Sequence, residues 1–269
     1  MYKFFSSLIW AIVYALIYFI VMNASGFFVS FIYSITGYAR RTNPLTCFLN
    51  LNKTSYFLAI IVSLILFILV TKVRNRKFFD FCGFKNADNK LYLYCIFLTL
   101  GLIPVITMVT IFLSLIFKSY GGTSKVLELF THDPIMVLFL VIFIPIMEEI
   151  VFRGLILNEI ISKTKNYILA ILIQGALFGI LHGNIVQGIY AFLLGIVLGF
   201  IAYSFHSIYP GIIMHCVFNL MGSIVMVKLA NITSNAYFNS VFMYIIFLAE
   251  FICLFIAVVF LYKELVTSG

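Results

Sequence analysis

The chain has 269 residues, of which 64% are hydrophobic and only 10% are charged. Soluble domains average about 45–50% apolar and about 25% charged residues, so this composition excludes a soluble enzyme, a nucleic-acid-binding domain and a disordered chain. The net charge of +8 is accounted for by Lys and Arg gathered in cytoplasmic loops. Because the apolar runs are unbroken and not the short alternating segments of a barrel, we predict an all-α, polytopic membrane protein with about eight transmembrane helices.

The predicted helices follow eight apolar runs, each read against the roughly 20 residues that a helix needs to cross a bilayer. The first run is too long for the apolar region of a signal peptide, so we expect it to be retained as a tilted or kinked helix. Between the runs lie polar connectors without internal repeats or a soluble domain. In chain order, the predicted helices cover residues 4–35, 56–71, 91–117, 134–159, 167–182, 185–205, 210–228 and 240–262.

The basic residues are distributed unevenly between the two ends of these helices. In an eight-span arrangement, the side with both termini collects ten: Lys3, Lys72, Arg74, Arg76, Lys77, Lys85, Lys90, Lys163, Lys165 and Lys263. The other side collects six: Arg40, Arg41, Lys53, Lys118, Lys125 and Lys228. Since cytoplasmic loops are enriched in Lys and Arg, we expect both termini to be cytoplasmic.

Ionisable groups inside membrane spans cost roughly 2.5–3.5 kcal/mol each on insertion scales, so they are candidates for function. Three spans carry most of them: Glu148, Glu149 and Arg153 in the fourth, His182 at the end of the fifth, and His215 with the amide of Asn219 in the seventh. The eighth span carries Glu250, to which the sequence assigns no role. The five cysteines include no C-x-x-C pair, so neither a disulfide framework nor a thiolate metal site is indicated.

The spacing of these residues predicts which of them share a helix face. Glu149 and Arg153 are four residues apart and can pair, which leaves Glu148 without a partner on its own helix. His215 and Asn219 also share a face, and Phe178 lies one turn before His182. If the three faces converge, they enclose a polar pocket inside the membrane, which the depth of these residues along their helices places open to the cytoplasm.

Peptide hydrolysis needs a base for water, a group that holds the water, and donors for the developing oxyanion. Glu148 suits the base and His182 can hold the same water, while His215 and Asn219 can donate to the oxyanion. Two His and one Glu also make a known hydrolytic zinc set, in which the ligands would be Glu148, His182 and His215. A metal-free and a zinc-dependent reaction therefore both stay open, and no cofactor is assigned.

Three motifs now stand in order along the chain: Glu148-Glu149-x-x-x-Arg153, Phe178-x-x-x-His182 and His215-x-x-x-Asn219. Their order and spacing resemble those of the CAAX-protease and bacteriocin-processing (Abi or CPBP) family of intramembrane proteases. The likeness runs from about residue 134 to residue 221. We therefore divide the integral membrane unit into N-terminal helices (1–133), a core of the CAAX-protease type (134–228) and a C-terminal helix (229–269).

The resemblance implies a membrane-embedded peptidase acting near the cytoplasmic side of the membrane. It implies that Glu148 and His182 activate water, that His215 and Asn219 stabilise the oxyanion, and that Glu149 and Arg153 support them. The expected substrates are membrane-associated or leader-bearing peptides or membrane proteins. The expected location is the lipid bilayer of a bacterial cell, and no nucleic acid is involved. The alternative is a non-proteolytic immunity or transport protein that uses the same polar cluster for binding, although no half-repeat typical of transporters is visible.

Overall fold

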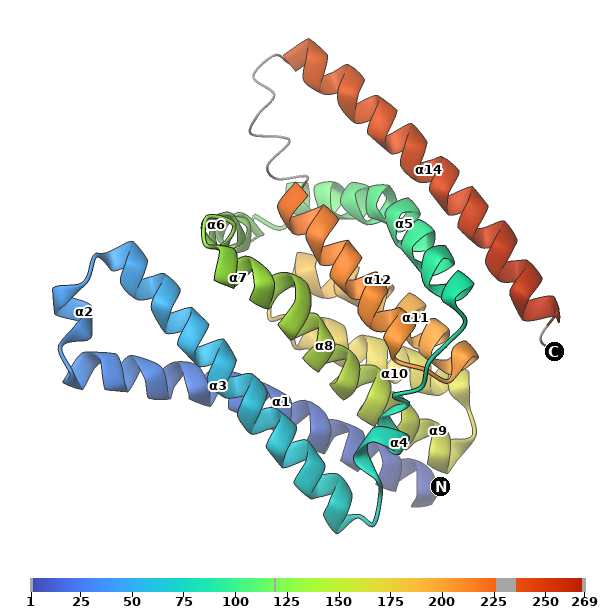
Figure 1. Ribbon diagram of the computed structural model, residues 1–269, viewed down its shortest axis with the longest axis horizontal. Coiled ribbons are helices and arrows are strands. Elements are labelled where there is room, and N and C mark those ends of the chain that lie inside the picture. Colours follow the sequence, from blue (N-terminus) through green and yellow to red (C-terminus); the bar gives the residue numbers. More distant parts are fainter. Residues whose placement is uncertain (1, 119, 226–235, 268–269) are drawn as a thin grey trace.

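The computed structural model describes residues 2–118, 120–225 and 236–267, and all of its regular elements are helices (Figure 1). The long helices are α1 (Tyr2–Ile35), α3 (Pro44–Val73), α5 (Asn89–Ile116), α11 (Ile185–Phe205) and α14 (Ala236–Thr267). The shorter ones are α2 (Tyr38–Arg41), α4 (Phe78–Cys82), α6 (Tyr120–Phe130), α10 (Tyr167–Ile180) and α12 (Tyr209–Asn219). The predicted all-α fold is confirmed.

The predicted fourth span is one long helical segment, Pro134–Thr164, in which two π-helical stretches interrupt the α-helix. Its parts are α7 (Pro134–Leu138), η1 (Phe139–Phe143), α8 (Ile144–Glu149), η2 (Ile150–Leu157) and α9 (Asn158–Thr164). A third π-helical stretch, η3 (Leu220–Val225), follows α12. π-helical turns are rare in proteins overall, but those that occur often lie at functional sites. Here they flank Glu148, Glu149 and Asn219.

Five described segments are long and apolar enough to cross a membrane: Tyr2–Ile35, Pro44–Val73, Asn89–Ile116, Pro134–Thr164 and Ile185–Phe205. This confirms a multi-pass membrane protein. The full number of eight spans stays a prediction, because α10 has only 14 residues and the predicted seventh span was expected to end at Lys228, outside the described residues.

The largest differences from the predicted helices are at α3 and α6. Helix α3 begins at Pro44 and not at residue 56, because the Asn43 side chain accepts a hydrogen bond from the Leu45 N–H and proline suits the first helical turn. Helix α6 occupies a stretch expected to be a connector. Hydropathy identifies only the apolar part of a helix. Helix α3 extends beyond its apolar run, and α6 lies between two such runs.

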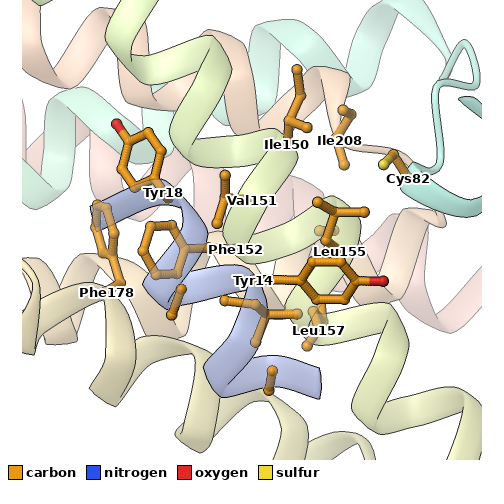
Figure 2. Close-up of a cluster of buried hydrophobic side chains, with 14 of the residues drawn as sticks. Tyr14, Tyr18, Cys82, Ile150, Val151, Phe152, Leu155, Leu157, Phe178 and Ile208 are labelled. Carbon is orange, nitrogen blue, oxygen red and sulfur yellow. The ribbon is translucent and has the colours of Figure 1, made fainter. Parts of the chain in front are cut away.

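The η2 stretch forms the centre of the bundle, and all eight of its residues are buried. Figure 2 shows Phe152 of η2 beside Tyr18 of α1 and Phe178 of α10. The ring of Phe152 meets that of Tyr18 edge-on at 6.4 Å and that of Phe178 at 4.9 Å. This packing fixes the fourth-span segment between the N-terminal helices and the α10–α11 pair.

A buried ion cluster ties the loop after α3 to α9. Glu159 is completely buried, and both of its carboxylate oxygens accept hydrogen bonds from Arg74, at 2.7 and 3.0 Å. Arg76 pairs with the same carboxylate, and Arg74 also donates to the Tyr14 hydroxyl. The basic residues of the 72–90 loop predict the orientation of the chain, and the structure shows that two of its arginines also anchor this end of the bundle.

Candidate active site

Glu149 lies at the end of α8 and is completely buried. Its Oε1 accepts a hydrogen bond of 2.6 Å from Nη1 of Arg153, which is also completely buried. The other terminal nitrogen of Arg153 donates to the Gly195 carbonyl on α11 at 3.3 Å. The ion pair predicted from the four-residue spacing is therefore present, and it joins the fourth-span segment to α11.

His215 of α12 lies between the two neighbouring glutamates. Its Nδ1 is 2.9 Å from Oε1 of Glu149, and its Nε2 is 3.5 Å from Oε2 of Glu148. A carboxylate only accepts hydrogen bonds, so Nδ1 carries a hydrogen and donates it to Glu149. The longer distance to Glu148 exceeds that of a normal hydrogen bond, which leaves Glu148 room for another partner.

His182 follows the last turn of α10 and is held by its own helix. Its Nδ1 lies 2.7 Å from the Phe178 carbonyl oxygen, which fixes the hydrogen on Nδ1 and leaves Nε2 as an acceptor. The Phe178 ring meets the His182 ring edge-on at 4.8 Å and the His215 ring at 5.7 Å. Phe178 therefore spaces the two imidazoles.

Asn219 ends α12, and its side-chain amide donates to the Leu140 carbonyl of η1 at 2.8 Å. This bond uses one of the two amide hydrogens. It also fixes α12 against the fourth-span segment at the level of the π-helical turn.

The four residues expected to act together all line one cavity of about 220 Å³: Glu148, His182, His215 and Asn219. Glu149 and Arg153 lie behind His215 and do not line it. Further wall residues come from helices to which the sequence assigned no site residue, namely Met22 of α1, Tyr56 of α3, Leu127 of α6 and Gln187 of α11. No spacing pattern marks these four, so a motif search could not find them.

The cavity lies toward one end of the bundle. It is lined by Leu127 of α6, by His182 of the α10–α11 turn and by Gln187 at the start of α11. No residue of α4, α9 or the basic 72–90 loop lines it, and these elements lie at the other end of the fourth-span segment from α6 (Figure 1). If the basic loops and both termini are cytoplasmic, the cavity lies toward the opposite side of the membrane. The two expectations, cytoplasmic termini and a pocket open to the cytoplasm, therefore conflict. Both stay predictions, because the structure contains no membrane to which the cavity could be referred.

The side chains do not form the alternative zinc site as they are placed. Among the described residues, no three His, Cys, Asp or Glu side chains come close enough to hold one metal ion. The Nδ1 bonds of His215 to Glu149 and of His182 to the Phe178 carbonyl leave both Nε2 atoms free, as in metal-ligating histidines. It is the spacing of Glu148, His182 and His215, and not their hydrogen bonds, that does not fit a metal in this arrangement.

Glu250 of α14 is also buried, and its Oε2 has no hydrogen-bond partner in the described part of the chain. It does not line the cavity. The structure gives it no role.

The fold and the cavity are those of a helical membrane protein with a polar, carboxylate-containing pocket among its central helices. The sequence model of the type II CAAX prenyl endopeptidase Rce1-like family matches residues 130–221, a stretch that contains all three motifs. This match confirms the resemblance to CAAX proteases and implies a membrane peptidase. No curated protein and no solved structure matches the chain.

Proposed function

We propose that this protein is an intramembrane endopeptidase that cleaves membrane-associated or leader-bearing peptides, with Glu148 as the base for the attacking water. The observation that carries the proposal is the shared cavity of Glu148, His182, His215 and Asn219. Of the two adjacent glutamates, Glu149 is bonded to Arg153 and His215, whereas Glu148 faces the cavity without a close partner. Glu148 is therefore the carboxylate that can take a proton from water.

The reaction follows from the groups on the cavity wall. A water held by Glu148 and by Nε2 of His182 attacks the carbonyl carbon of the peptide, and Glu148 takes its proton. The electron pair of the carbonyl moves onto its oxygen, which accepts hydrogen bonds from the free amide hydrogen of Asn219 and from Nε2 of His215 in its imidazolium form, which donates through both ring nitrogens. As the intermediate collapses, the C–N bond breaks and the leaving nitrogen takes the proton from Glu148.

Glu149 and Arg153 support this chemistry from behind the cavity wall. Glu149 accepts the Nδ1 hydrogen of His215 and thereby orients the ring. Arg153 compensates the charge of Glu149 in a fully buried position, where an unpaired carboxylate would be strongly unfavourable. Phe178 packs against both imidazoles. Glu149 and Arg153 position the reacting groups from outside the cavity, whereas Phe178 also forms part of its wall.

The proposed setting is a bacterial cell membrane with both chain termini in the cytoplasm. The charge distribution along the chain supports this orientation. In that case the cavity lies nearer the outer face of the membrane, since its lining residues come from the end opposite the basic loops.

The test is cleavage of a panel of membrane-anchored and leader-bearing peptides by purified protein in proteoliposomes. Glu148→Gln keeps the shape of the side chain but removes the base, so the rate should fall by roughly 10²–10⁴-fold with unchanged folding. Glu128→Gln, at an exposed position on α6, is the matched control and should cleave normally. Wild-type protein that cuts none of the panel, but binds a peptide through the same residues, would instead support the immunity or transport alternative.

A further inference from the structure

The hydrogen-bond donors of the motif residues in the cavity are nearly all committed. Nδ1–H of His182 is bonded to the Phe178 carbonyl, and one amide hydrogen of Asn219 is bonded to the Leu140 carbonyl. His215 gives its Nδ1 hydrogen to Glu149 and directs Nε2 at Glu148. From the motif residues, the oxyanion of the proposed reaction thus receives one free Asn219 hydrogen and a His215 nitrogen that it shares with Glu148. Hydrolases usually hold this charge with preorganised donors, so a further donor is expected on the cavity wall.

Tyr56 of α3 carries such a donor. Its side chain lines the cavity together with Glu148. Its ring meets the ring of Phe130 edge-on at 6.5 Å and lies 6.1 Å from that of Phe139. These contacts hold the phenol in place from the side of α6 and η1, so the hydroxyl is preorganised.

The Tyr56 hydroxyl has no hydrogen-bond partner within the described residues. Ring packing accounts for the ring of Tyr56, and its hydroxyl remains able to donate a hydrogen bond to a molecule in the cavity. Tyr190 of α11 also lines the cavity. Unlike Tyr190, Tyr56 comes from a helix outside the segment 130–221 that matches the family model.

We propose that Tyr56 is an oxyanion donor, a catalytic residue supplied by the N-terminal helices. The inference rests on the proposed peptidase reaction and deepens it. When water adds to the peptide carbonyl and Glu148 takes the proton, the electron pair of the C=O bond moves to oxygen. The Tyr56 hydroxyl donates a hydrogen bond to that oxygen and keeps its own proton throughout. When the C–N bond breaks, the carbonyl re-forms and the hydrogen bond weakens.

The test compares Tyr56→Phe with wild type in the same proteoliposome cleavage assay, with rates expressed per folded protein as measured by size-exclusion chromatography and thermal unfolding. Loss of one oxyanion donor lowers kcat by about 10²–10³-fold in hydrolases, so we expect a fall in kcat of about 10²-fold with little change in KM. Tyr33→Phe is the matched control, because it removes a hydroxyl that bonds to Thr54 in the same α1–α3 hairpin and keeps the ring that packs against Tyr38. It should cleave at the wild-type rate.

The outcomes separate this inference from the function on which it rests. Wild-type cleavage with an unchanged kcat in Tyr56→Phe overturns the donor role and leaves the peptidase proposal intact. A loss that disappears after correction for folded protein, or one seen equally in Tyr33→Phe, also overturns it. A change confined to KM would assign Tyr56 to substrate binding and reject its role in the transition state. Absence of cleavage by the wild type would instead overturn the proposed function.

Discussion

The Nδ1 atom of His215 lies 2.9 Å from Oε1 of Glu149, and that same oxygen accepts a hydrogen bond from Arg153. One buried carboxylate thus orients an imidazole of the cavity and pairs with a buried guanidinium. Its second oxygen, Oε2, has no hydrogen bond within the described residues and faces the backbone of Gly211 on α12. The position of His215 therefore depends on Glu149, Arg153 and Gly211 together.

Arg153→Ala should destabilise the protein. It leaves Glu149 as an uncompensated charge at a position that is 0% exposed, and breaking a buried pair in this way typically costs about 3–5 kcal/mol. Thermal unfolding in detergent should show a clearly lower Tm, with a matching fall in the amount of folded protein. A Tm equal to that of wild type would show that the pair does not support the fold.

The double variant Glu149→Gln with Arg153→Met should regain stability but not activity. Replacing a buried ion pair by neutral side chains of similar volume is often neutral or stabilising, so Tm should rise above that of Arg153→Ala. Cleavage should stay low, because the amide introduced in place of the Glu149 carboxylate is a weaker hydrogen-bond acceptor for His215. Full activity in this variant would contradict the orienting role of Glu149.

Gly211→Ala should disturb the same carboxylate from the other side. A Cβ at position 211 would lie 2.7 Å from Oε2 of Glu149, so the carboxylate or α12 must shift. Overpacking of this kind costs about 1–3 kcal/mol, and the shift should also lower the cleavage rate. Gly26→Ala is the control, since a Cβ there meets nothing within 4 Å and should leave cleavage unchanged. Equal stability and equal cleavage rates in Gly211→Ala and Gly26→Ala would refute the close packing at Gly211.

Chelators should leave cleavage unaffected. As placed, Glu148, His182 and His215 do not meet around a common ion position. Activity is measured before and after prolonged treatment with EDTA and with 1,10-phenanthroline, followed by dialysis. Loss of cleavage that returns on addition of zinc would show that these side chains rearrange around a metal, since metal binding at such a site is reversible.

Cysteine labelling should decide the orientation of the cavity. In a background with the five native cysteines replaced by alanine, Thr42→Cys reports the end of the bundle at which the cavity lies, and Asn86→Cys reports the basic end. If the positive-inside rule sets the topology, a membrane-impermeant maleimide should label Thr42→Cys in intact cells and Asn86→Cys only after permeabilisation. The reverse pattern would place the cavity on the cytoplasmic side.

The sequence was sufficient for the parts of this protein that depend on local spacing. The pair of Glu149 and Arg153 follows from helical periodicity, and the apolar runs predict α1, α5 and α11 within a few residues. The bond from His215 to Glu149 was not predictable, because it joins residues 66 positions apart and depends on how α12 packs on α8. Tyr56 could not be recognised either, since a tyrosine in an apolar span carries no signal until its neighbours are known.

The cavity combines two portions of the chain that can diverge independently. The motif residues lie within 130–221, whereas Met22, Tyr56 and Leu127 on the facing wall come from earlier helices. If the proposed peptidase function holds, substitutions in the α1–α3 hairpin and α6 should alter which peptides are accepted while the chemistry of the motif residues is kept. Exchanging these N-terminal helices between homologues should transfer substrate preference without rebuilding the catalytic helices.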